Sequence, residues 1–382
     1  MKSNKTSVLP ALTIGKHTSP YPIIQGGMGI RISASRLASA VANAGGIGVV
    51  STVALGLDSP YYKKEGATSK DYFRANILAL QDELKMAKQI SPKGVIGVNC
   101  MVAITDYEDM VRTSAEYGAD IIFSGAGLPV NLPDYVKDYP DVAIVPIISS
   151  VKAASIIIKK WERLHKRMPD AYVVETPNYA GGHLGARPED ITDPVFSLEK
   201  VVPEVLEFLE KEAKLNIPVV AAGGIFDHQD VLRMIGLGAH GVQLGSRFVC
   251  TYECDADDLF KDVFMKAKKE DIVIVKSPVG MPGRAIRSEF TERFEKGLDV
   301  DDKCFAKCLK HCACRDNRET YCIASVLDKA QRGNLAEGLF FAGSNAWRIK
   351  KIVSVKELMN ELVGIQEGVE ASSPSESVSR TS

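Results

Sequence analysis

The feature that most constrains the fold is a regular alternation of two kinds of segment between Pro22 and about residue 270. Short runs rich in β-branched residues alternate with longer runs whose apolar residues recur at helical spacing, a pattern typical of a parallel sheet covered by helices. Eight strands are predicted, at residues 23–26, 48–51, 95–100, 121–124, 143–148, 172–175, 219–222 and 242–244. An open doubly wound sheet would give the same alternation, but a count of eight favours a closed barrel. Among the helices, we expect one over 33–44 with Ser33 as its cap, and one over 150–167.

The chain divides by composition into four parts. Residues 1–20 form an N-terminal segment, and 21–270 form the predicted barrel. The strand-helix alternation stops after about Asp271, so 271–365 is read as a C-terminal extension with helices and a cysteine cluster. Residues 366–382 are rich in Ser and Glu and are expected to be a disordered tail.

Two glycine loops follow the last two predicted strands. Gly223 and Gly224 come after the strand at 219–222, and Gly245 with Ser246 comes after the strand at 242–244. In a parallel barrel these loops lie side by side, and their backbone N–H groups can hold a phosphate. Glycine permits a close approach of the backbone to phosphate oxygens. The pair therefore predicts a phosphate-bearing ligand, although tight turns alone would also explain either loop.

A histidine flanked by glycines follows the sixth predicted strand, in the motif AGGHLG. Gly182 precedes His183, and the loop belongs to the carboxyl ends of the strands, where barrels keep their active sites. Histidine can act as general acid, general base or hydrogen-bond donor near neutral pH. We therefore predict His183 as the catalytic residue.

Residues that suit a flat aromatic ligand follow two other strands. Gln25, Gly26, Gly27 and Met28 end the first strand, where the glycines leave room and the polarizable methionine packs well on aromatic faces. Asn99, near the end of the third strand, offers amide donors and an acceptor to the edge of a heterocycle.

The motifs PIIQGGMG, GVNCM, AGGHLG, PVVAAGGI and GVQLGSRF occur in this order over about residues 20–290. As a set they resemble the nitronate monooxygenase family and, equally, its relative the FMN-dependent enoyl-acyl-carrier-protein reductase. The resemblance implies an α/β fold of the TIM (β/α)8 barrel class, to which the sequence adds the C-terminal helical, cysteine-containing extension. It also implies an FMN-dependent oxidoreductase, and we expect a nitronate monooxygenase that oxidises alkyl nitronates with dioxygen.

The resemblance further implies roles for individual residues. FMN phosphate is expected on Gly224, Gly245 and Ser246, and His183 beside the substrate. The flavin is expected to be surrounded by Gly26, Gly27, Met28, Asn99 and Gln243, with Gln25, Glu175, Gly182 and Gly223 as further cofactor-binding residues. The run Glu175 to Tyr179 departs from the family pattern, so either Glu175 or Thr176 could face the flavin.

Two alternative functions stay open at this stage. The same residues would serve an enoyl-acyl-carrier-protein reductase using NAD(P)H, whose substrate is an enoyl thioester instead of an alkyl nitronate. A flavin-free barrel that binds a phosphorylated metabolite would also use the two glycine loops.

Charge and hydropathy indicate which partners to expect. The formal net charge of −1 provides no excess of positive charge for binding nucleic acid or an anionic membrane surface. No apolar run suits a signal peptide or a membrane span, so a cytoplasmic protein acting on a small molecule is expected. Assembly into a homo-oligomer is left open.

Five of the eight cysteines fall between Cys304 and Cys322. Their spacing, C-x3-C-x3-C-x-C-x7-C, matches neither the paired CxxC pattern of zinc sites nor the ferredoxin pattern, so we assign no metal ligand. Whether Cys304, Cys308, Cys312, Cys314 and Cys322 bind a metal or an iron–sulfur cluster is left open. The segment 276–287, rich in Pro, Gly and Arg, is read as a solvated connector without a role.

Overall fold

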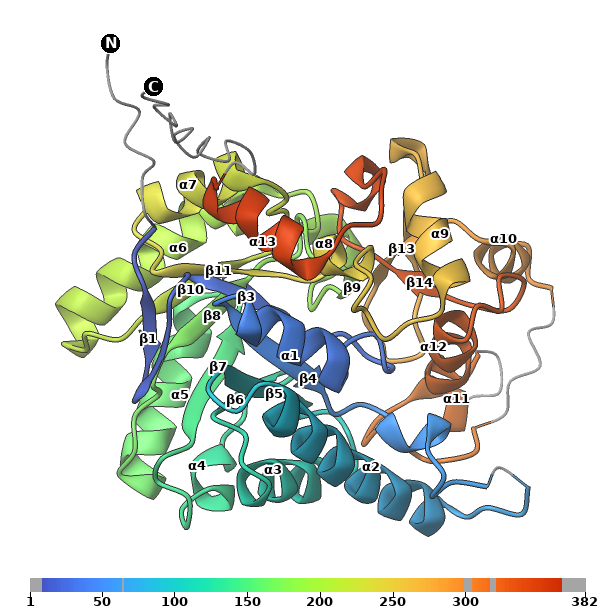
Figure 1. Cartoon of the computed structure of the whole chain (residues 1–382), viewed down its shortest axis with the longest axis horizontal. Coiled ribbons are helices and arrows are strands. Elements are labelled where there is room, and N and C mark those ends of the chain that lie inside the picture. The colour runs from blue at the N-terminus through green and yellow to red at the C-terminus, as the bar shows by residue number, and fades with distance from the viewer. Residues whose placement is uncertain (1–8, 64, 299–303, 317–320, 366–382) are drawn as a thin grey trace, which may run out of the picture.

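The computed structural model describes residues 9–63, 65–298, 304–316 and 321–365. Its centre is a closed barrel of eight parallel strands surrounded by helices, which is the TIM barrel architecture (Figure 1). The strands, in chain order, are β3 (Ile23–Gln25), β4 (Ile47–Ser51), β5 (Val95–Met101), β6 (Ile121–Gly125), β7 (Ala143–Ile148), β8 (Tyr172–Glu175), β10 (Val219–Ala222) and β11 (Gly241–Leu244). Each pairs with its chain neighbours, and β11 closes the barrel against β3. The eight predicted strands and the predicted closed barrel are confirmed.

Alternate residues of the strands fill the barrel interior. They form a buried cluster separate from the layer between strands and helices; it includes Ile24, Val49, Phe123, Val173 and Val220. The N-terminal hairpin of β1 (Leu12–Ile14) and β2 (His17–Ser19) adds Leu12 and Ile14 to this cluster. The hairpin thus closes the amino end of the barrel and leaves the carboxyl end as the mouth.

The helices that accompany the barrel strands are α1 (Ser35–Asn43), α2 (Ser69–Ile90), α3 (Tyr107–Glu116), α4 (Leu132–Tyr135), α5 (Val151–His165), α6 (Leu198–Glu207), α7 (His228–Gly236) and α8 (Ser246–Val249). α5 begins as expected, since the Ser150 side chain accepts a hydrogen bond from the backbone N–H of Ala153.

The predicted serine cap of the first helix is wrong. α1 starts two residues after Ser33, and its first N–H groups donate to carboxylates from distant elements instead of to a local side chain. Ala34 and Leu37 donate to Asp255, and Ser35 donates to Glu83. A carboxylate satisfies these N–H groups and also favours the positive end of the helix, so no local cap is needed.

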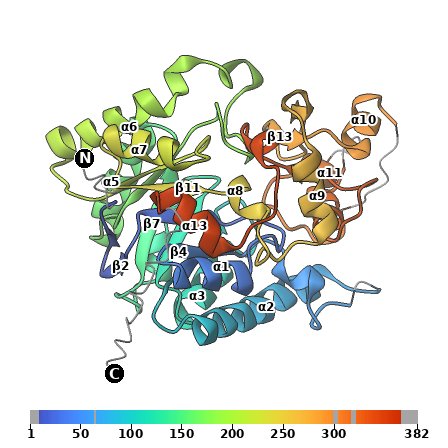
Figure 2. The same ribbon diagram turned by 45° about the horizontal axis from the view of Figure 1, so that its top comes forward.

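After the barrel, the chain builds a second group of elements on one side of the mouth (Figure 2). They are α9 (Asp258–Lys266), β12 (Ile272–Val275), β13 (Gly283–Ile286), α10 (Glu289–Glu295), α11 (Ala313–Asp316), α12 (Ile323–Gln331) and β14 (Phe340–Phe341). The last helix, α13 (Val355–Val363), lies apart from this group, over the barrel (Figure 2). A small antiparallel sheet joins β12, β13 and β14, and the two-residue strand β9 (Gly182–His183) pairs with β13. α13 then returns to pack against α1 and α7 of the barrel (Figure 1).

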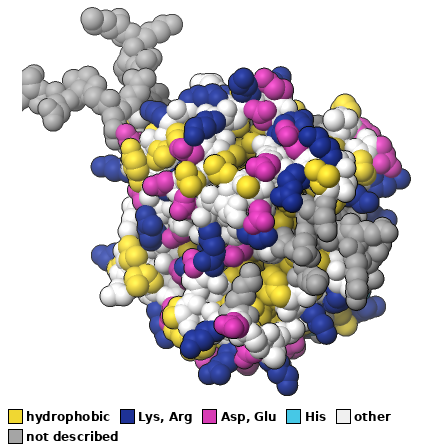
Figure 3. Space-filling model, turned by 90° about the vertical axis from the view of Figure 1, so that its right-hand side faces the viewer, with side chains coloured by type: hydrophobic (Ala, Val, Ile, Leu, Met, Phe, Trp, Pro, Cys, Tyr) yellow, Lys and Arg dark blue, Asp and Glu magenta, His cyan; other side chains and the backbone are white. Residues whose placement is uncertain are grey.

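The described surface is mixed in charge. On the face in Figure 3, basic and acidic side chains are interspersed. None of the helices in the described ranges is long and apolar enough to cross a membrane. The tail predicted to be disordered, 366–382, lies outside the described residues.

Candidate functional site

Three polar side chains project into the mouth of the barrel. Val98, Val174 and Val242 pack outward against the helices, and neighbouring side chains in a strand point to opposite faces. Asn99, Glu175 and Gln243, which follow them, therefore face inward at the carboxyl ends of β5, β8 and β11. Within the described chain no hydrogen bond or ion pair occupies the Glu175 carboxyl group, and burial raises its pKa to about 7.

The loop after β3 crosses above two of these side chains. A Cβ on Gly26 would lie 3.3 Å from the Gln243 side chain, and one on Gly27 would lie only 2.4 Å from the Asn99 Cβ. Gln25 holds this loop in place, because its buried amide donates to the Gly26 carbonyl and accepts from the Val49 N–H. Gln25 can therefore act on a ligand only through the backbone that it positions.

Met28 connects this loop to the loop after β11. Its backbone N–H donates to Ser33 Oγ, and its carbonyl accepts from the Ser33 N–H. Its sulfur would lie 3.5 Å from a Cβ placed on Gly245. The predicted ring-binding residue Met28 and the predicted phosphate loop at Gly245 therefore lie side by side.

Glycine is required for different reasons in the loop after β10 and in the loop after β11. Gly223 and Gly224 have φ of +104° and +74°, a region that favours glycine, and a Cβ on Gly224 would also meet Tyr179 at 2.7 Å. Gly245 has an ordinary φ of −106°, and a Cβ there would make only normal contacts with Met28. Neither backbone strain nor packing explains glycine at 245, whereas a ligand lying against it would.

A segment far along the chain completes this region and was missed by the sequence analysis. The backbone N–H of Gly343 donates to Ser246 Oγ over 2.8 Å, and Asn345 Nδ2 donates to the Gly224 carbonyl over 2.6 Å. Within the described chain, the buried hydroxyls of Ser344 and Thr176 have no hydrogen-bond partner. Two unpaired buried hydroxyls beside two glycine loops fit a polar ligand such as a phosphate. The sequence AGSN at 342–345 was the available signal.

His183 lies at the edge of the mouth on β9, opposite Gly283 of β13. Its Nε2 shares a hydrogen bond of 2.8 Å with the hydroxyl of Ser277, and its ring meets the edge of Phe341 with centroids 4.9 Å apart. Burial lowers the pKa of His183 to about 4, so the imidazole is neutral at pH 7. A neutral imidazole can donate to an anionic oxygen or accept a proton.

The reading of residues 276–287 as a solvated connector is wrong. Ser277 and Arg284 are buried, and β13 holds β9 in place. The Arg284 guanidinium donates to the carbonyls of Pro177, Asn178 and Ala180, which belong to the loop between β8 and β9. Burial lowers the pKa of Arg284 to about 10, and no ion pair of Arg284 occurs in the described part of the chain. Arg284 therefore stabilises the loop that leads to His183.

Replacing Arg284 with methionine is expected to lower the free energy of unfolding by about 2–4 kcal/mol. Each buried carbonyl left without a donor costs about 1–3 kcal/mol, and losing the buried charge offsets part of this cost. Arg284→Lys should not restore stability, because one ammonium cannot reproduce the planar arrangement of guanidinium donors. Urea unfolding checks this against Arg163→Met, which alters an exposed side chain of α5. Equal stability of Arg284→Met and the parent protein would contradict it.

A pocket of about 370 Å³ opens near the residues that follow His183 in the chain, and its lining includes Gly185 and Ala186. It lies between the loop after β8 and the segment before β13, where the Leu184 N–H donates to the Pro282 carbonyl. Its lining combines apolar and charged residues: Ser149, Pro177, Gly185, Ala186, Arg187, Pro188, Asp190, Phe196, Gly280, Met281 and Pro282. A small organic substrate could therefore reach the histidine from this side.

No metal ligand was predicted at the mouth. In the ranges that the structure covers, no three His, Cys, Asp or Glu side chains are placed to hold a single metal ion. Cys100 faces away from the mouth into the helix layer, and burial raises the pKa values of Cys100, Cys250 and Cys254 to about 12 each.

A closed parallel barrel with glycine loops and a histidine at its carboxyl end defines a TIM-barrel protein whose candidate residues lie where such barrels keep their active sites. A family model described as nitronate monooxygenase matches residues 11–364. The chain belongs to the nitronate monooxygenase family and is an oxidoreductase of that family.

Two curated relatives show how far the sequence similarity extends. A "(3aS,4S,5R,7aS)-5-hydroxy-7a-methyl-1-oxo-octahydro-1H-indene-4-carboxyl-CoA dehydrogenase" of Mycobacterium tuberculosis is 28% identical over 277 residues, covering 72% of this chain and 66% of that protein. A "probable nitronate monooxygenase" of Staphylococcus aureus is 28% identical over 306 residues, covering 72% of this chain and 78% of the relative. The match thus covers just under two thirds of the length of the Mycobacterium tuberculosis protein and a larger share, 78%, of the Staphylococcus aureus protein.

Two solved structures share the fold. FabK from Thermotoga maritima superposes with a TM-score of 0.66 at 23% identity, covering 96% of both chains. Nitroalkane oxidase from Streptomyces ansochromogenes also gives a TM-score of 0.66, at 18% identity, covering 91% of this chain and 95% of that chain. At these identities the similarity shows the barrel architecture.

Proposed function

We propose that the protein is an FMN-dependent oxidoreductase that oxidises alkyl nitronates with dioxygen. The observation that carries this proposal is a neutral histidine, held by a serine hydroxyl, on the short strand that follows the barrel strand β8. Family membership supports the reaction class. When bound, FMN would accept electrons from the substrate and pass them to dioxygen.

The residues around the mouth would hold FMN in two parts. The phosphate would lie against Gly224, Gly245 and Ser246, where backbone N–H groups and a hydroxyl are available. The flavin ring would lie among Gly26, Gly27, Met28, Asn99 and Gln243. Support comes from the space left at Gly245 and from Asn99, whose side-chain amide makes no hydrogen bond within the described residues.

The histidine would act on the substrate. His183 would donate a hydrogen bond to a nitronate oxygen, or take the α-proton of a neutral nitroalkane. Ser277 would orient the ring through its hydrogen bond to Nε2. Glu175 would be partly protonated near pH 7, which reduces electrostatic repulsion of an anionic substrate at the mouth.

An anaerobic mixing experiment tests this function. The purified protein is mixed with an alkyl nitronate in one portion and with NADH in another, and the visible flavin absorbance is followed. Loss of absorbance with the nitronate alone is expected, with recovery on admitting air. Loss with NADH alone would contradict nitronate oxidation, and a colourless protein that does not take up FMN would contradict the flavin itself.

Enoyl-acyl-carrier-protein reduction is a second candidate, favoured by the size and lining of the pocket. Its volume of about 370 Å³ exceeds what a short nitronate fills, and Phe196, Met281 and Pro282 would suit an acyl chain. In that reaction His183 would donate to the thioester carbonyl. Loss of flavin absorbance with NADH, followed by recovery on adding an enoyl thioester, would establish this function.

We place the protein in the cytoplasm, acting on a small molecule. The buried thiols of Cys100, Cys250 and Cys254, which are not in disulfides, suit a reducing compartment.

Glu175 is expected to make the free energy of unfolding depend on pH. Its pKa is about 7 in the folded protein, above its ordinary value of 4.5. As pH rises, the carboxyl group therefore loses its proton at a lower pH in the unfolded state than in the folded state. Glu175 therefore lowers stability progressively as pH rises from 4.5 to 7. His183, with its lowered pKa, acts in the opposite direction below pH 6.5, so only a comparison with Glu175→Gln isolates the carboxyl.

Urea unfolding at pH 5, 6, 7 and 8 measures this difference. Glu175→Gln should gain stability relative to the parent as pH rises to 7, and the gain should level off above it. The exposed Glu204→Gln is the matched control. A difference between Glu175→Gln and the parent that does not change with pH would contradict the raised pKa.

A further inference from the structure

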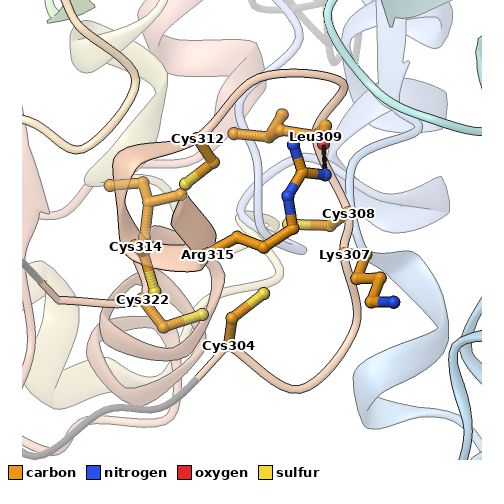
Figure 4. Close-up of a pocket in the computed structure, with 9 residues that line it drawn as sticks. Cys304, Lys307, Cys308, Leu309, Cys312, Cys314, Arg315 and Cys322 are labelled. Carbon is orange, nitrogen blue, oxygen red and sulfur yellow. Dashed lines mark hydrogen bonds between the residues drawn. The ribbon is translucent and has the colours of Figure 1, made fainter. Parts of the chain in front are cut away.

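Five cysteines from two segments gather around one small pocket (Figure 4). They are Cys304, Cys308, Cys312, Cys314 and Cys322. Residues 304–312 are not helical, and Leu309 forms a bridge with Ile104, so the chain curves around the pocket. The curved path brings together thiols that would otherwise be spread along a helix.

The thiols are close enough to affect one another electrostatically. Burial, and then the neighbouring Cys322, Cys304 and Cys312, raise the pKa of Cys308. Burial, and then Cys322, Cys304 and Cys312, also raise the pKa of Cys314 to about 12, and its thiol hydrogen bonds with Cys322. The five side chains therefore lie near one another around a single pocket.

The surroundings suit a buried, negatively charged centre. Ile30, Ala54 and Tyr72 are buried in the same apolar cluster as the cysteines. Lys307 and Arg315 also line the pocket. Thiolate-bound clusters carry net negative charge, which the two nearby cations would offset, while the apolar residues would keep water away from the sulfurs.

A polynuclear centre fits this arrangement better than a single ion. A tetrahedral zinc ion brings every thiolate to about 2.3 Å from one point, whereas no three side chains in the described ranges are placed to share one ion. An iron–sulfur cluster distributes four thiolates over several irons and keeps them farther apart. The present pocket, about 10 Å³, holds about one water, so the thiols would turn outward as the cluster is built.

We propose that Cys304, Cys308, Cys312 and Cys322 bind an iron–sulfur cluster. Cys304, Cys308 and Cys312 lie at every fourth residue of the non-helical segment that curves around the pocket, and Cys322 lines the same pocket at the N-cap of α12. Cys314 is left as the fifth cysteine, a hydrogen-bond partner of Cys322.

The cluster would lie against the barrel mouth. Thr105 donates to the Cys308 carbonyl and Lys310 donates to the Ala103 carbonyl, so the cysteine segment is docked on the loop after β5. The Ala313 N–H donates to the Pro278 carbonyl, next to the serine that holds His183.

Metal analysis of the full-length protein tests the proposal. The protein is purified anaerobically, and iron, acid-labile sulfide and zinc are measured, with an electron paramagnetic resonance spectrum after dithionite reduction. About four irons and four sulfides per chain are expected for a four-thiolate cluster. Cys308→Ser should lose most of the iron, whereas Cys314→Ser and the distant Cys250→Ser should keep it. These readouts need neither FMN nor turnover, so they stand apart from the proposed reaction.

Three results would overturn the proposed iron–sulfur cluster or its ligands. A folded parent protein that binds no iron after anaerobic reconstitution with ferrous iron and sulfide would overturn the proposal. One zinc per chain without iron would replace the cluster with a single structural ion. Full iron content in Cys308→Ser would also overturn the ligand set, and if that variant does not fold, the parent's iron and sulfide content decides.

Discussion

Replacing His183 with alanine is expected to lower turnover by about 10²–10⁴-fold while FMN is retained. A positioned acid or base typically contributes that factor. His183 lies on the short strand β9, outside the glycine loops that would hold the phosphate, so its loss should not release the cofactor. Steady-state kinetics with an alkyl nitronate, together with the flavin absorbance of the purified variant, measures both quantities.

Two further variants make the His183 result interpretable. His165→Ala removes a histidine of α5 that shares a hydrogen bond with the Val130 carbonyl, and it should leave turnover unchanged. Ser277→Ala removes the partner of Nε2 and should have a smaller effect than His183→Ala. Full turnover in His183→Ala would remove the histidine from the mechanism. Loss of FMN from the variant would show a binding role instead.

Replacing Gly245 with valine is expected to weaken FMN binding by about 10²-fold or more. The branched side chain would occupy the space where the phosphate is expected, and each lost hydrogen bond to a charged group costs about 1.5–3 kcal/mol. The protein itself tolerates a Cβ there, since only Met28 would lie in contact with it. The fold should therefore persist, and titration of the apoprotein with FMN measures the affinity.

Gly236→Val provides the matched control for Gly245→Val. Gly236 ends α7, and a Cβ there would have no neighbour within 4 Å among the described atoms. This variant should bind FMN like the parent. Unchanged affinity in Gly245→Val would contradict the phosphate assignment, whereas equal loss in both variants would point to a general effect on the fold.

The barrel could be predicted from the sequence because its determinants are local. A buried parallel strand needs only a few β-branched residues close together, so runs such as 143–148 can be recognised from the sequence alone. The start of α1 could not be predicted in the same way. Its N–H groups are satisfied by Asp255 and Glu83, and spacing along the chain does not reveal contacts between residues so far apart.

Contacts between residues far apart in sequence also limited what could be predicted of the candidate site. The residues after the barrel strands were predicted as site residues, and the structure brings Gly26, Gly27, Asn99 and Gln243 together. Ser277, Arg284 and the segment 343–345 were missed, because they reach the mouth through the β9–β13 pairing and through contacts with Ser246 and Gly224. Ser277 and Arg284 belong to a stretch without a recognisable motif, and the signal at 342–345, AGSN, is short and lies far along the chain from the barrel strands.

The pairing of β9 with β13 has a consequence for how this enzyme could diversify. The strand that carries His183 is aligned by residues about a hundred positions later, while the glycines of the barrel loops lie on other elements. Exchange of residues 276–286 between homologous proteins could thus alter the environment of the histidine and leave the barrel glycines untouched. Substrate preference could then evolve, or be engineered, separately from cofactor affinity.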